Sequence, residues 1–308
     1  LLSEFHDILP GTSIQSAEES SLRLMNHGLE ILSRIRMKSF VQLCRAASAA
    51  ISSRIEDSSG DSAYFLFVYN PHPWEVCSQL ICELQLADQN LNGTFTDFHV
   101  VDAEGNEMAC QVEKEASNIP LDWRKRLVIK APLKPSALTT LKCLPREIEQ
   151  KIPPIVSGFV NETDAHIKVK GHNSEFRISK ESGALVLMKI DNEPVLTGPS
   201  CVPIVLQDSS DPWGVHVDRF DTVIGTFELM SPEEASELCG LETSVPPVHI
   251  VESGQVRTVV ESCFRYKTSS LVMRYCMLHD ESRIEVDMRV NWQEIDKMVK
   301  APLYSAGR

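Results

Sequence analysis

The apolar residues of this chain change their spacing once, and that change limits the folds open to it. From Ser16 to about Ile55 they recur at intervals of three or four residues, which is the period of an amphipathic helix. From Tyr64 onward they fall in short, often alternating runs, which are typical of β-strands. A polar segment, residues 56–61, separates the two patterns. The sequence therefore predicts a mainly β protein with an N-terminal helical segment.

The predicted helix contains about 40 residues and is about 60 Å long at the usual rise. Its apolar stripe runs from Leu22 to Ile51, and the opposite face is charged. A single helix cannot bury such a stripe, so we expect it to belong to a helical bundle. The alternative, that the stripe binds another protein chain, stays open.

Two groups of predicted strands follow the helix. The first group has the spacing of a small β-sandwich, and we expect the segment Asp122–Lys125 within it to be a loop. Its expected strands are 64–69, 76–86, 98–101, 109–112, 126–129 and 138–144.

The second group begins after Lys151–Pro154, a proline-rich segment typical of a stiff linker. Its last four strands are close together and joined by polar turns, which predicts an antiparallel meander within a large β-sandwich. Its expected strands are 166–169, 175–178, 185–190, 202–206, 221–229, 248–252, 256–266, 270–278 and 283–290. We therefore predict three domains, at residues 1–56, 62–150 and 155–308.

The charge balance excludes several classes of partner. The chain has 43 acidic and 30 basic residues, a formal net charge of −13. Nucleic acids and anionic membrane surfaces require clustered Lys and Arg, so neither is an expected partner. No segment reaches the roughly 18 apolar residues that a membrane-spanning helix needs. A neutral sugar is compatible with this charge, although the charge does not indicate one.

The nine cysteines form no Cys-x-x-Cys pair, which excludes the common structural zinc spacings. Several lie inside apolar runs, among them Cys82 and Cys143, and are best interpreted as small buried hydrophobic residues. An odd, unpaired set suits a reducing compartment, so we expect a cytoplasmic protein.

A histidine and an aspartate, His6 and Asp7, stand side by side within the string Phe5–Ile14, just before a Pro-Gly turn. Imidazole can bind a metal ion, and a carboxylate can bind the metal or accept hydrogen bonds from a polar substrate. By residue type alone, such a pair in a loop is more often solvated surface. The whole string is much more specific than the pair.

The string resembles a segment of the family 38 glycoside hydrolases, the zinc-dependent retaining α-mannosidases, and in particular their bacterial-type and cytosolic branch. The resemblance implies that His6 is a zinc ligand and that Asp7 contacts the bound sugar. The phrase Asn70–Trp74 resembles part of the small β-domain of that family. Three further phrases resemble its large, galactose-mutarotase-like β-sandwich, namely 211–214, 251–257 and 290–292.

In that family the other zinc ligands and the aspartate nucleophile lie upstream, on an α/β catalytic domain. We therefore expect this chain to be the middle-to-C-terminal part of a larger α-mannosidase, with no catalytic residue of its own and with a final sheet that lacks strands. By itself it should be inactive and bind zinc weakly or not at all. The expected partners are an α-mannoside and the missing catalytic domain, and a homo-oligomer is compatible with the sequence.

Two other hypotheses belong to different functional classes: a carbohydrate-binding or structural β-sandwich module with a helical interaction arm, and an interaction protein that pairs through its helix. Asp211 and Trp213, with His216 and Asp218, could contact a sugar, although turn chemistry explains them better. His216, Asp218 and Asp221 could bind a metal but lack a further ligand at a defined spacing. No serine-hydrolase elbow, P-loop or dinucleotide fingerprint occurs. The string at His6 favours the mannosidase hypothesis, because a binding module has no need of it.

Overall fold

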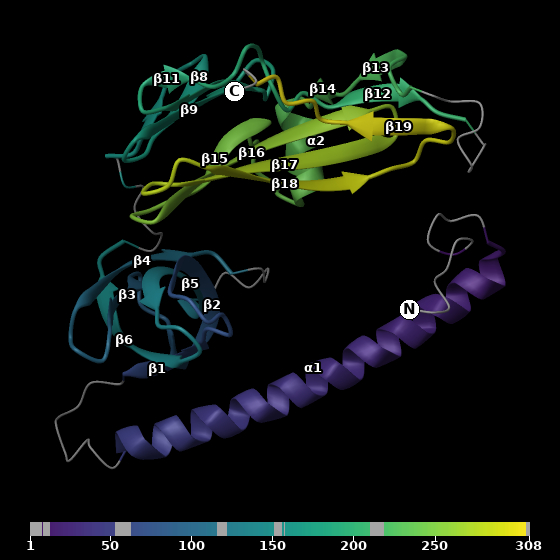
Figure 1. Cartoon of the computed structure of the whole chain (residues 1–308). Coiled ribbons are helices and arrows are strands. Elements are labelled where there is room, and N and C mark those ends of the chain that lie inside the picture. The colour runs from purple at the N-terminus through teal and green to yellow at the C-terminus, as the bar shows by residue number, and fades with distance from the viewer. Residues whose placement is uncertain are drawn as a thin grey trace. The chain divides into compact units, whose positions relative to one another are not determined.

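The structure is a computed structural model of the chain. It describes residue 8 and residues 13–52, 63–115, 122–150, 156, 158–209 and 219–305. The described part is mainly β, with one long N-terminal helix and several antiparallel sheets, as the sequence predicts (Figure 1). The chain divides into two compact units, one containing the helix and the other containing residues 62–207 and 221–308. The predicted domain boundaries stay a prediction, and the linker Lys151–Pro154 lies outside the described residues.

Helix α1 spans Gln15–Ser52. Glu18 lies in its first turn, where a carboxylate interacts favourably with the helix dipole. Long apolar side chains along the helix are exposed, among them Leu29 and Leu32 at 64% each. The described residues contain no second helix of comparable length, so the helical bundle stays a prediction. No helix among the described residues is long and apolar enough to cross a membrane.

The first β-structure is one six-stranded antiparallel sheet in the order β1-β6-β3-β4-β5-β2. It curls around a core that includes Leu127, Ile129 and Leu141, each at most 1% exposed (Figure 1). Cys143 lies in this core and Cys82 packs against it, as predicted. The strands are β1 (Tyr64–Tyr69), β2 (Val76–Asn90), β3 (Phe95–Val101), β4 (Glu107–Glu113), β5 (Asp122–Leu133) and β6 (Leu138–Ile148).

The segment Asp122–Lys125 is the beginning of β5, so its prediction as a loop is wrong. Asp122 Oδ2 accepts hydrogen bonds from the backbone N–H of Thr96, at 2.8 Å, and from Asn90 Nδ2, at 2.9 Å. Trp123 Nε1 donates to the carbonyl of Leu86 at 3.0 Å. These contacts with β2 and β3 hold the first residues of β5 in the strand. The polar sequence of residues 122–125 does not by itself indicate a strand.

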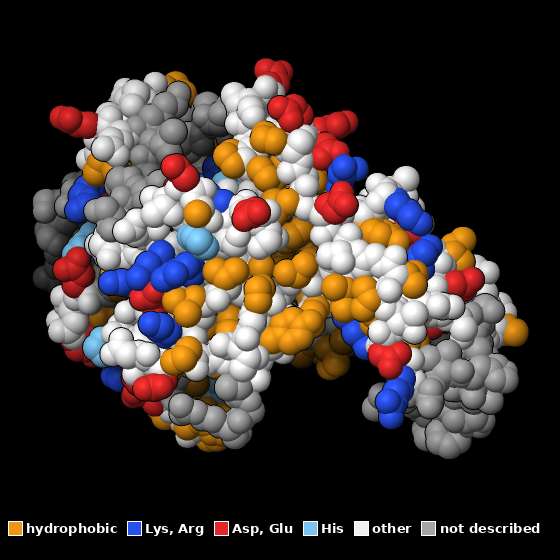
Figure 2. All heavy atoms as spheres, turned by 90° about the horizontal axis from the view of Figure 1, so that it is seen from above, with side chains coloured by type: hydrophobic (Ala, Val, Ile, Leu, Met, Phe, Trp, Pro, Cys, Tyr) orange, Lys and Arg blue, Asp and Glu red, His pale blue; other side chains and the backbone are white. Residues whose placement is uncertain are grey.

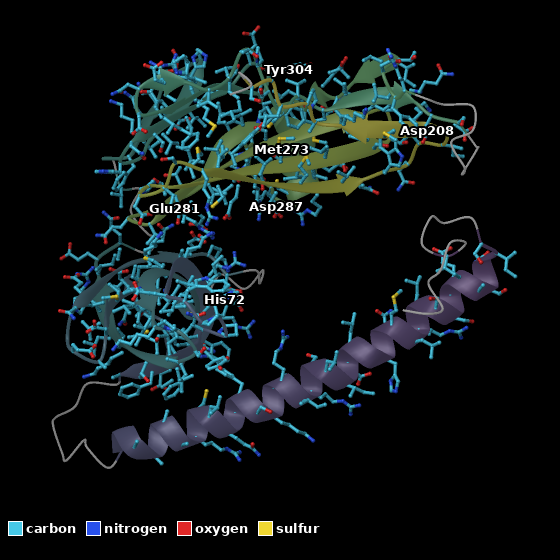
Figure 3. All side chains as sticks on the ribbon, viewed as in Figure 1. His72, Asp208, Met273, Glu281, Asp287 and Tyr304 are labelled. Atoms are coloured by element: carbon cyan, nitrogen blue, oxygen red, sulfur yellow. The ribbon has the colours of Figure 1, made fainter. Side chains whose placement is uncertain are left out.

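The turn after β1 is anchored by Asn70 rather than by its tryptophan. Asn70 is 2% exposed, and its amide group donates to the carbonyls of Trp74, at 2.9 Å, and Leu133, at 3.2 Å. Trp74 is 58% exposed and stacks on His72, which is labelled in Figure 3. A buried amide, and not the tryptophan, therefore connects the turn to β5.

The remaining strands form a sandwich of antiparallel sheets. One sheet has the order β11-β10-β9-β8-β7, with β7 (Val160–Glu162), β8 (His166–Lys170), β9 (Ser174–Ser179), β10 (Leu185–Ile190) and β11 (Glu193–Pro194). A three-stranded sheet has the order β13-β12-β19, with β12 (Ile204–Gln207), β13 (Val223–Thr226) and β19 (Lys297–Lys300). The last sheet contains β14 (Glu228–Leu229), β15 (Val248–Ser253), β16 (Arg257–Tyr266), β17 (Ser269–Leu278) and β18 (Ile284–Asn291).

The core of the sandwich lies between these sheets. Phe176 of β9 and Phe264 of β16 are each 1% exposed, and Met273 and Tyr275 of β17 are fully buried. Figure 3 shows Met273 between the layers. The buried hydroxyl of Tyr275 donates to the carbonyl of Gly183 at 2.9 Å, so its polar atom is satisfied.

Strands β15 to β18 pair in chain order, which confirms the predicted meander. The predicted single strand 221–229 is instead two strands in different sheets, because the chain passes from β13 to β14 at the buried Phe227. Figure 2 views the molecule from above relative to Figure 1, and hydrophobic side chains gather over the middle of that view. The expected loss of strands from the final sheet stays a prediction.

A short helix, α2 (Pro232–Cys239), is present where the sequence analysis expected none. Ser231 Oγ accepts a hydrogen bond from the backbone N–H of Glu234 at 3.2 Å, and Glu234 Oε2 accepts one from the backbone N–H of Ser231 at 2.8 Å. This reciprocal pair is a capping box, followed here by proline at the first helical position. Residues around α2, including Met230 and Ala235, pack on one face of β16 and β17 at Cys263 and Val272.

Candidate functional site

The residues predicted to bind zinc and to contact a sugar lie outside the described part of the chain. His6 and Asp7 lie outside the described residues, as do residues 211–218 with their predicted sugar-contacting and metal-binding side chains. Asp221 is described and lies two residues before β13. The roles of these residues therefore stay predictions, and the described part of the chain shows two other groups of polar side chains.

The first group surrounds a cleft of about 430 Å³ within the β-unit. Residues of β3, β4 and β6 line one side, and residues 250–255, which form the end of β15 and the following turn, line the other. Its charged lining residues are Asp97, Lys114, Arg146 and Glu252. Asp97 and Arg146 form an ion pair with each other.

Beside the cleft, a buried ion pair joins the small β-sheet to the large sandwich. Arg257 of β16 donates from Nε to Glu113 Oε1 at 2.8 Å and from Nη2 to Glu113 Oε2 at 2.7 Å. The two side chains are 9% and 1% exposed. Arg257 Nη1 also donates to Gln79 Oε1 at 3.1 Å. This bidentate geometry is the strong form of an arginine–carboxylate contact, and it satisfies both buried charges.

Gln111 extends the junction to the backbone. Its Oε1 accepts hydrogen bonds from the backbone N–H groups of Val256, at 2.9 Å, and Arg257, at 2.8 Å, and its Nε2 donates to Glu113 Oε1 at 2.7 Å. A Cβ atom added to Gly254 would lie 2.5 Å from Gln111 Oε1, so this close approach of the turn requires glycine.

Glu252 is the carboxyl group that faces the cleft. Its Oε1 accepts a hydrogen bond from the backbone N–H of Lys114 at 3.1 Å. Burial, together with the negative charge of Glu113, raises the pKa of Glu252 to about 7. Glu252 therefore exchanges a proton near neutral pH, a property typical of functional groups in clefts. The carboxylates of Asp97 and Glu113 nearby are held by arginines, so the described cleft offers one proton donor rather than a pair of free carboxyl groups.

A second contact between the same two parts lies at the turn after β17. Lys130 of β5 forms ion pairs with Glu281 at 2.6 Å and with Asp280 at 3.2 Å. Figure 3 shows Glu281 at the end of the large sandwich that faces the small β-sheet. These pairs are more exposed than Glu113–Arg257, so each contributes less to stability.

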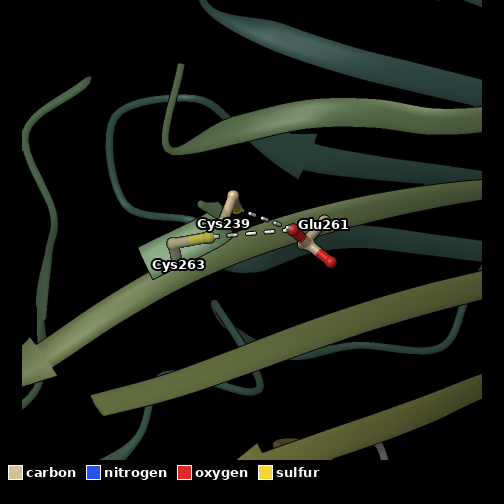
Figure 4. Close-up of side chains that lie close together, drawn as sticks. All are labelled: Cys239, Glu261 and Cys263. Carbon is tan, nitrogen blue, oxygen red and sulfur yellow. Dashed lines mark hydrogen bonds between the residues drawn. The ribbon is translucent and has the colours of Figure 1, made fainter. Parts of the chain in front are cut away.

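The second group consists of Cys239, Glu261 and Cys263 (Figure 4). Both thiols donate to Glu261 Oε1, at 3.8 Å from Cys239 and 3.9 Å from Cys263. Burial and the neighbouring carboxylate raise the pKa of Cys263 to about 12, and the same two causes raise the pKa of Cys239. All nine cysteines of the chain are free. Cys77 and Cys239 are exposed.

Sequence reasoning missed both groups. Glu113 and Arg257 are 144 residues apart, and neither belongs to a recognisable motif. Cys239 and Cys263 are also far apart in sequence, whereas the common zinc-binding motifs place two cysteines close together. The Ser231-Pro-Glu-Glu phrase is a helix-start signature that could have revealed α2, and with it the position of Cys239.

Comparison with known proteins gives likenesses among solved structures alone. No protein-family model and no curated protein sequence matches the chain. Among solved structures, the crystal structure of an α-mannosidase from Enterococcus faecalis V583 is similar over 93% of this chain, with a TM-score of 0.47 and 10% sequence identity. The chain spans 36% of the length of that protein. At this identity the likeness transfers neither a substrate nor a residue role.

Proposed function

We propose that this chain is part of a zinc-dependent retaining α-mannosidase similar to the family 38 glycoside hydrolases. The observation that carries the proposal is the string Phe5–Ile14, which contains His6 and Asp7. The order of elements supports it, because a long helix, a small β-structure and a large β-sandwich follow the string in the order that the resemblance implies.

In the proposed enzyme, His6 supplies one imidazole ligand to zinc, and Asp7 accepts hydrogen bonds from hydroxyl groups of the bound mannoside. Zinc in such a site holds sugar hydroxyls in place. The aspartate nucleophile and the second carboxyl group, which acts as acid and then base, belong to the catalytic domain that we propose as the partner of this chain. The 308-residue chain alone is then inactive. Its nine free cysteines support a cytoplasmic location.

The experiment that tests this proposal uses the longer protein that we propose to contain this chain, with an aryl α-mannoside as substrate. His6→Ala should lower zinc content and activity together, whereas Asp7→Asn should keep zinc and lower activity, because orientation of the sugar is lost while the metal ligand stays. Asp164→Asn, at an exposed turn between β7 and β8, is the control and should change neither.

Two results would contradict the proposal. One is a longer protein that lacks α-mannosidase activity, and the other is turnover of the substrate by the isolated 308-residue chain after removal of host glycosidases. Normal zinc content and normal kinetics in Asp7→Asn would remove Asp7 from the site, and loss of zinc in that variant would make Asp7 a ligand.

The alternative, a carbohydrate-binding or structural module with a helical interaction arm, is favoured by the exposed apolar side chains of α1. It predicts that the isolated chain binds mannosides without zinc, and that the longer protein has no hydrolytic activity. Isothermal titration of the chain with mannose and mannobiose, in the presence of a chelator, distinguishes the two hypotheses.

A further inference from the structure

We propose that Cys239, Glu261 and Cys263 form a binding site for a thiophilic divalent cation, zinc above all, with His249 as the fourth ligand. The site lies between α2 and the outer face of the β15–β18 sheet. It shares no residue with the mannosidase site proposed at His6 and does not depend on that proposal.

The fold brings the three side chains to one place from two elements. Glu261 and Cys263 are two residues apart on β16, so they point to the same face of the sheet. Cys239 is the last residue of α2, and Gly240 follows it in the left-handed conformation that ends the helix, with φ of 68°. Because residues of α2 pack on Cys263, the end of the helix lies above this face (Figure 4).

The separations of the donor atoms are close to those of a tetrahedral zinc site. The two sulfur atoms lie 3.8 and 3.9 Å from Glu261 Oε1, and all three donor atoms lie within 4.8 Å of one another. In a tetrahedral site with the usual zinc–sulfur and zinc–oxygen bonds, a sulfur and an oxygen ligand are about 3.6 Å apart. The two sulfur–oxygen separations therefore need to contract by only a few tenths of an ångström to surround the ion.

We assign the fourth ligand to His249, whose ring lies against Glu261 and must move closer to the two sulfur atoms to complete the site. It lies directly opposite Glu261 in the β15–β16 ladder, and its Nε2 is 3.7 Å from Glu261 Oε1. Its Nδ1 is 2.8 Å from the carbonyl of Pro246. When Nδ1–H donates to that carbonyl, the neutral ring presents the lone pair of Nε2 toward Glu261. Histidine ligands of metals are commonly oriented by such a bond to the backbone.

The charges around the group also fit a divalent cation. Arg274 of β17, opposite Glu261 in the ladder, donates from Nε to Glu261 Oε2 at 2.6 Å, so Oε1 stays available. Two thiolates and one carboxylate carry three negative charges, which zinc and the Arg274 guanidinium neutralise together. Binding displaces the two thiol protons into solvent. Glu261 and Cys263 are buried and Cys239 is exposed, which gives the ion a path of entry.

The test is titration of the reduced, metal-free 308-residue chain with Co²⁺ and then Zn²⁺. Cobalt bound to thiolates has intense near-ultraviolet absorption that reports the number of sulfur ligands, and zinc should displace it. We expect one site per chain with two thiolates. Cys239→Ser should weaken zinc binding by about tenfold or more, because it removes a direct ligand at an exposed position where the fold tolerates the change.

Matched controls separate this site from other cysteines and from the mannosidase hypothesis. Cys77→Ser changes an exposed cysteine on another sheet and should leave the titration unchanged. His6→Ala should also leave it unchanged, so that failure of one proposal does not affect the other. His249→Ala should weaken zinc binding less than Cys239→Ser and alter the visible cobalt spectrum. An unaltered spectrum would show that His249 is not the fourth ligand.

The proposal is overturned if the reduced chain shows no stoichiometric cobalt–thiolate absorption, or if Cys239→Ser leaves that absorption intact. It is also overturned if Cys239 and Cys263 form a disulfide under the same reducing conditions, as shown by peptide mass mapping. A Cys263→Ser variant is not required for any of these outcomes, so a folding defect from changing that fully buried residue does not confuse the result.

Discussion

Single residues at the junction between the small β-sheet and the sandwich combine burial with charge. Glu113 and Arg257 form a bidentate pair with nearly all of their polar atoms satisfied, whereas Glu252 has one backbone donor and a negative neighbour. Glu252 is the residue at which pH acts on this junction.

We predict that Glu252→Gln stabilises the chain at alkaline pH. The pKa of Glu252 is raised from 4.5 to about 7 in the folded chain, so the folded state holds a proton that the unfolded state has lost. Its contribution to stability is therefore present at low pH and is lost as pH rises from 4.5 to about 7. Glutamine mimics the protonated form, and the gain at pH 8 should be on the order of 1–3 kcal/mol.

Urea unfolding of both forms at pH 4 and pH 8 measures this effect, with little difference expected at pH 4. Glu242→Gln, at an exposed position after α2, serves as the control and should behave alike at both values. An equal change in the free energy of unfolding at pH 4 and pH 8 would show that Glu252 is not protonated in the folded chain at neutral pH.

Among the elements, the two helices differ in what fixes them. Helix α2 is short, and its start is determined by local side-chain contacts and its position by Ala235 against the sheet. Helix α1 is long, and the periodicity of its apolar residues is enough to predict it, but its apolar side chains are exposed in the described structure. Helix α2 is therefore sensitive to the loss of its cap, and α1 is sensitive to whatever covers its apolar stripe.

We predict that Ser231→Ala lowers the stability of α2 by about 1 kcal/mol, because the backbone N–H of Glu234 loses its acceptor. Hydrogen exchange of the α2 amides should quicken by about fivefold, the equivalent of that free energy. Ser244→Ala, at an exposed position outside the capping box, should leave the exchange of the α2 amides unchanged. Unchanged exchange in Ser231→Ala would mean that packing, and not the capping box, holds this helix.

We predict that the isolated chain self-associates through α1 and that Leu29→Lys combined with Leu32→Lys abolishes the association. Both side chains are 64% exposed, and burial of apolar surface is favourable at about 25 cal/mol per Å². Sedimentation velocity over a range of concentrations measures the association. Lys38→Gln on the same helix is the control. A chain that stays monomeric at all concentrations would contradict the prediction.

For the molecule as a whole, contacts between distant parts of the sequence hold the small β-sheet against the large sandwich. The Glu113–Arg257 pair is buried, and the Lys130 pairs with Glu281 and Asp280 are more exposed. We therefore expect the buried pair, more than the Lys130 pairs, to couple the unfolding of the two parts.

We predict that Arg257→Ala destabilises the β-unit by about 3–5 kcal/mol, because it leaves the Glu113 carboxylate buried without its partner. The small β-sheet should then unfold before the sandwich, and a single calorimetric transition should become two. Arg265→Ala, which removes a pair with Glu234 that is 46% and 39% exposed, is the control and should keep one transition. A single transition in Arg257→Ala, with unchanged midpoint, would show that the pair does not couple the parts.

The candidate sites were less predictable than the fold. The His6-Asp7 prediction depends on a short contiguous string, and it stays a prediction because both residues lie outside the described structure. The Glu113–Arg257 junction and the Cys239–Glu261–Cys263 group depend on residues that the chain brings together from different elements. Motifs based on sequence spacing identify ligands that lie on the same turn or hairpin. These two groups instead combine residues from separate elements.

The sequence by itself determined where the long helix and most strands lie, because burial of one face imposes a period of 3.6 on a helix and of 2 on a strand. It failed where that period is interrupted: polar contacts anchor Asp122 to β2 and β3, and the chain changes sheets at the buried Phe227. Only the tertiary structure decided which strands are neighbours, how Arg257 reaches Glu113, and which side chains surround Cys263. These outcomes depend on the packing of segments far apart in the chain, and local patterns of hydrophobicity do not encode their partners.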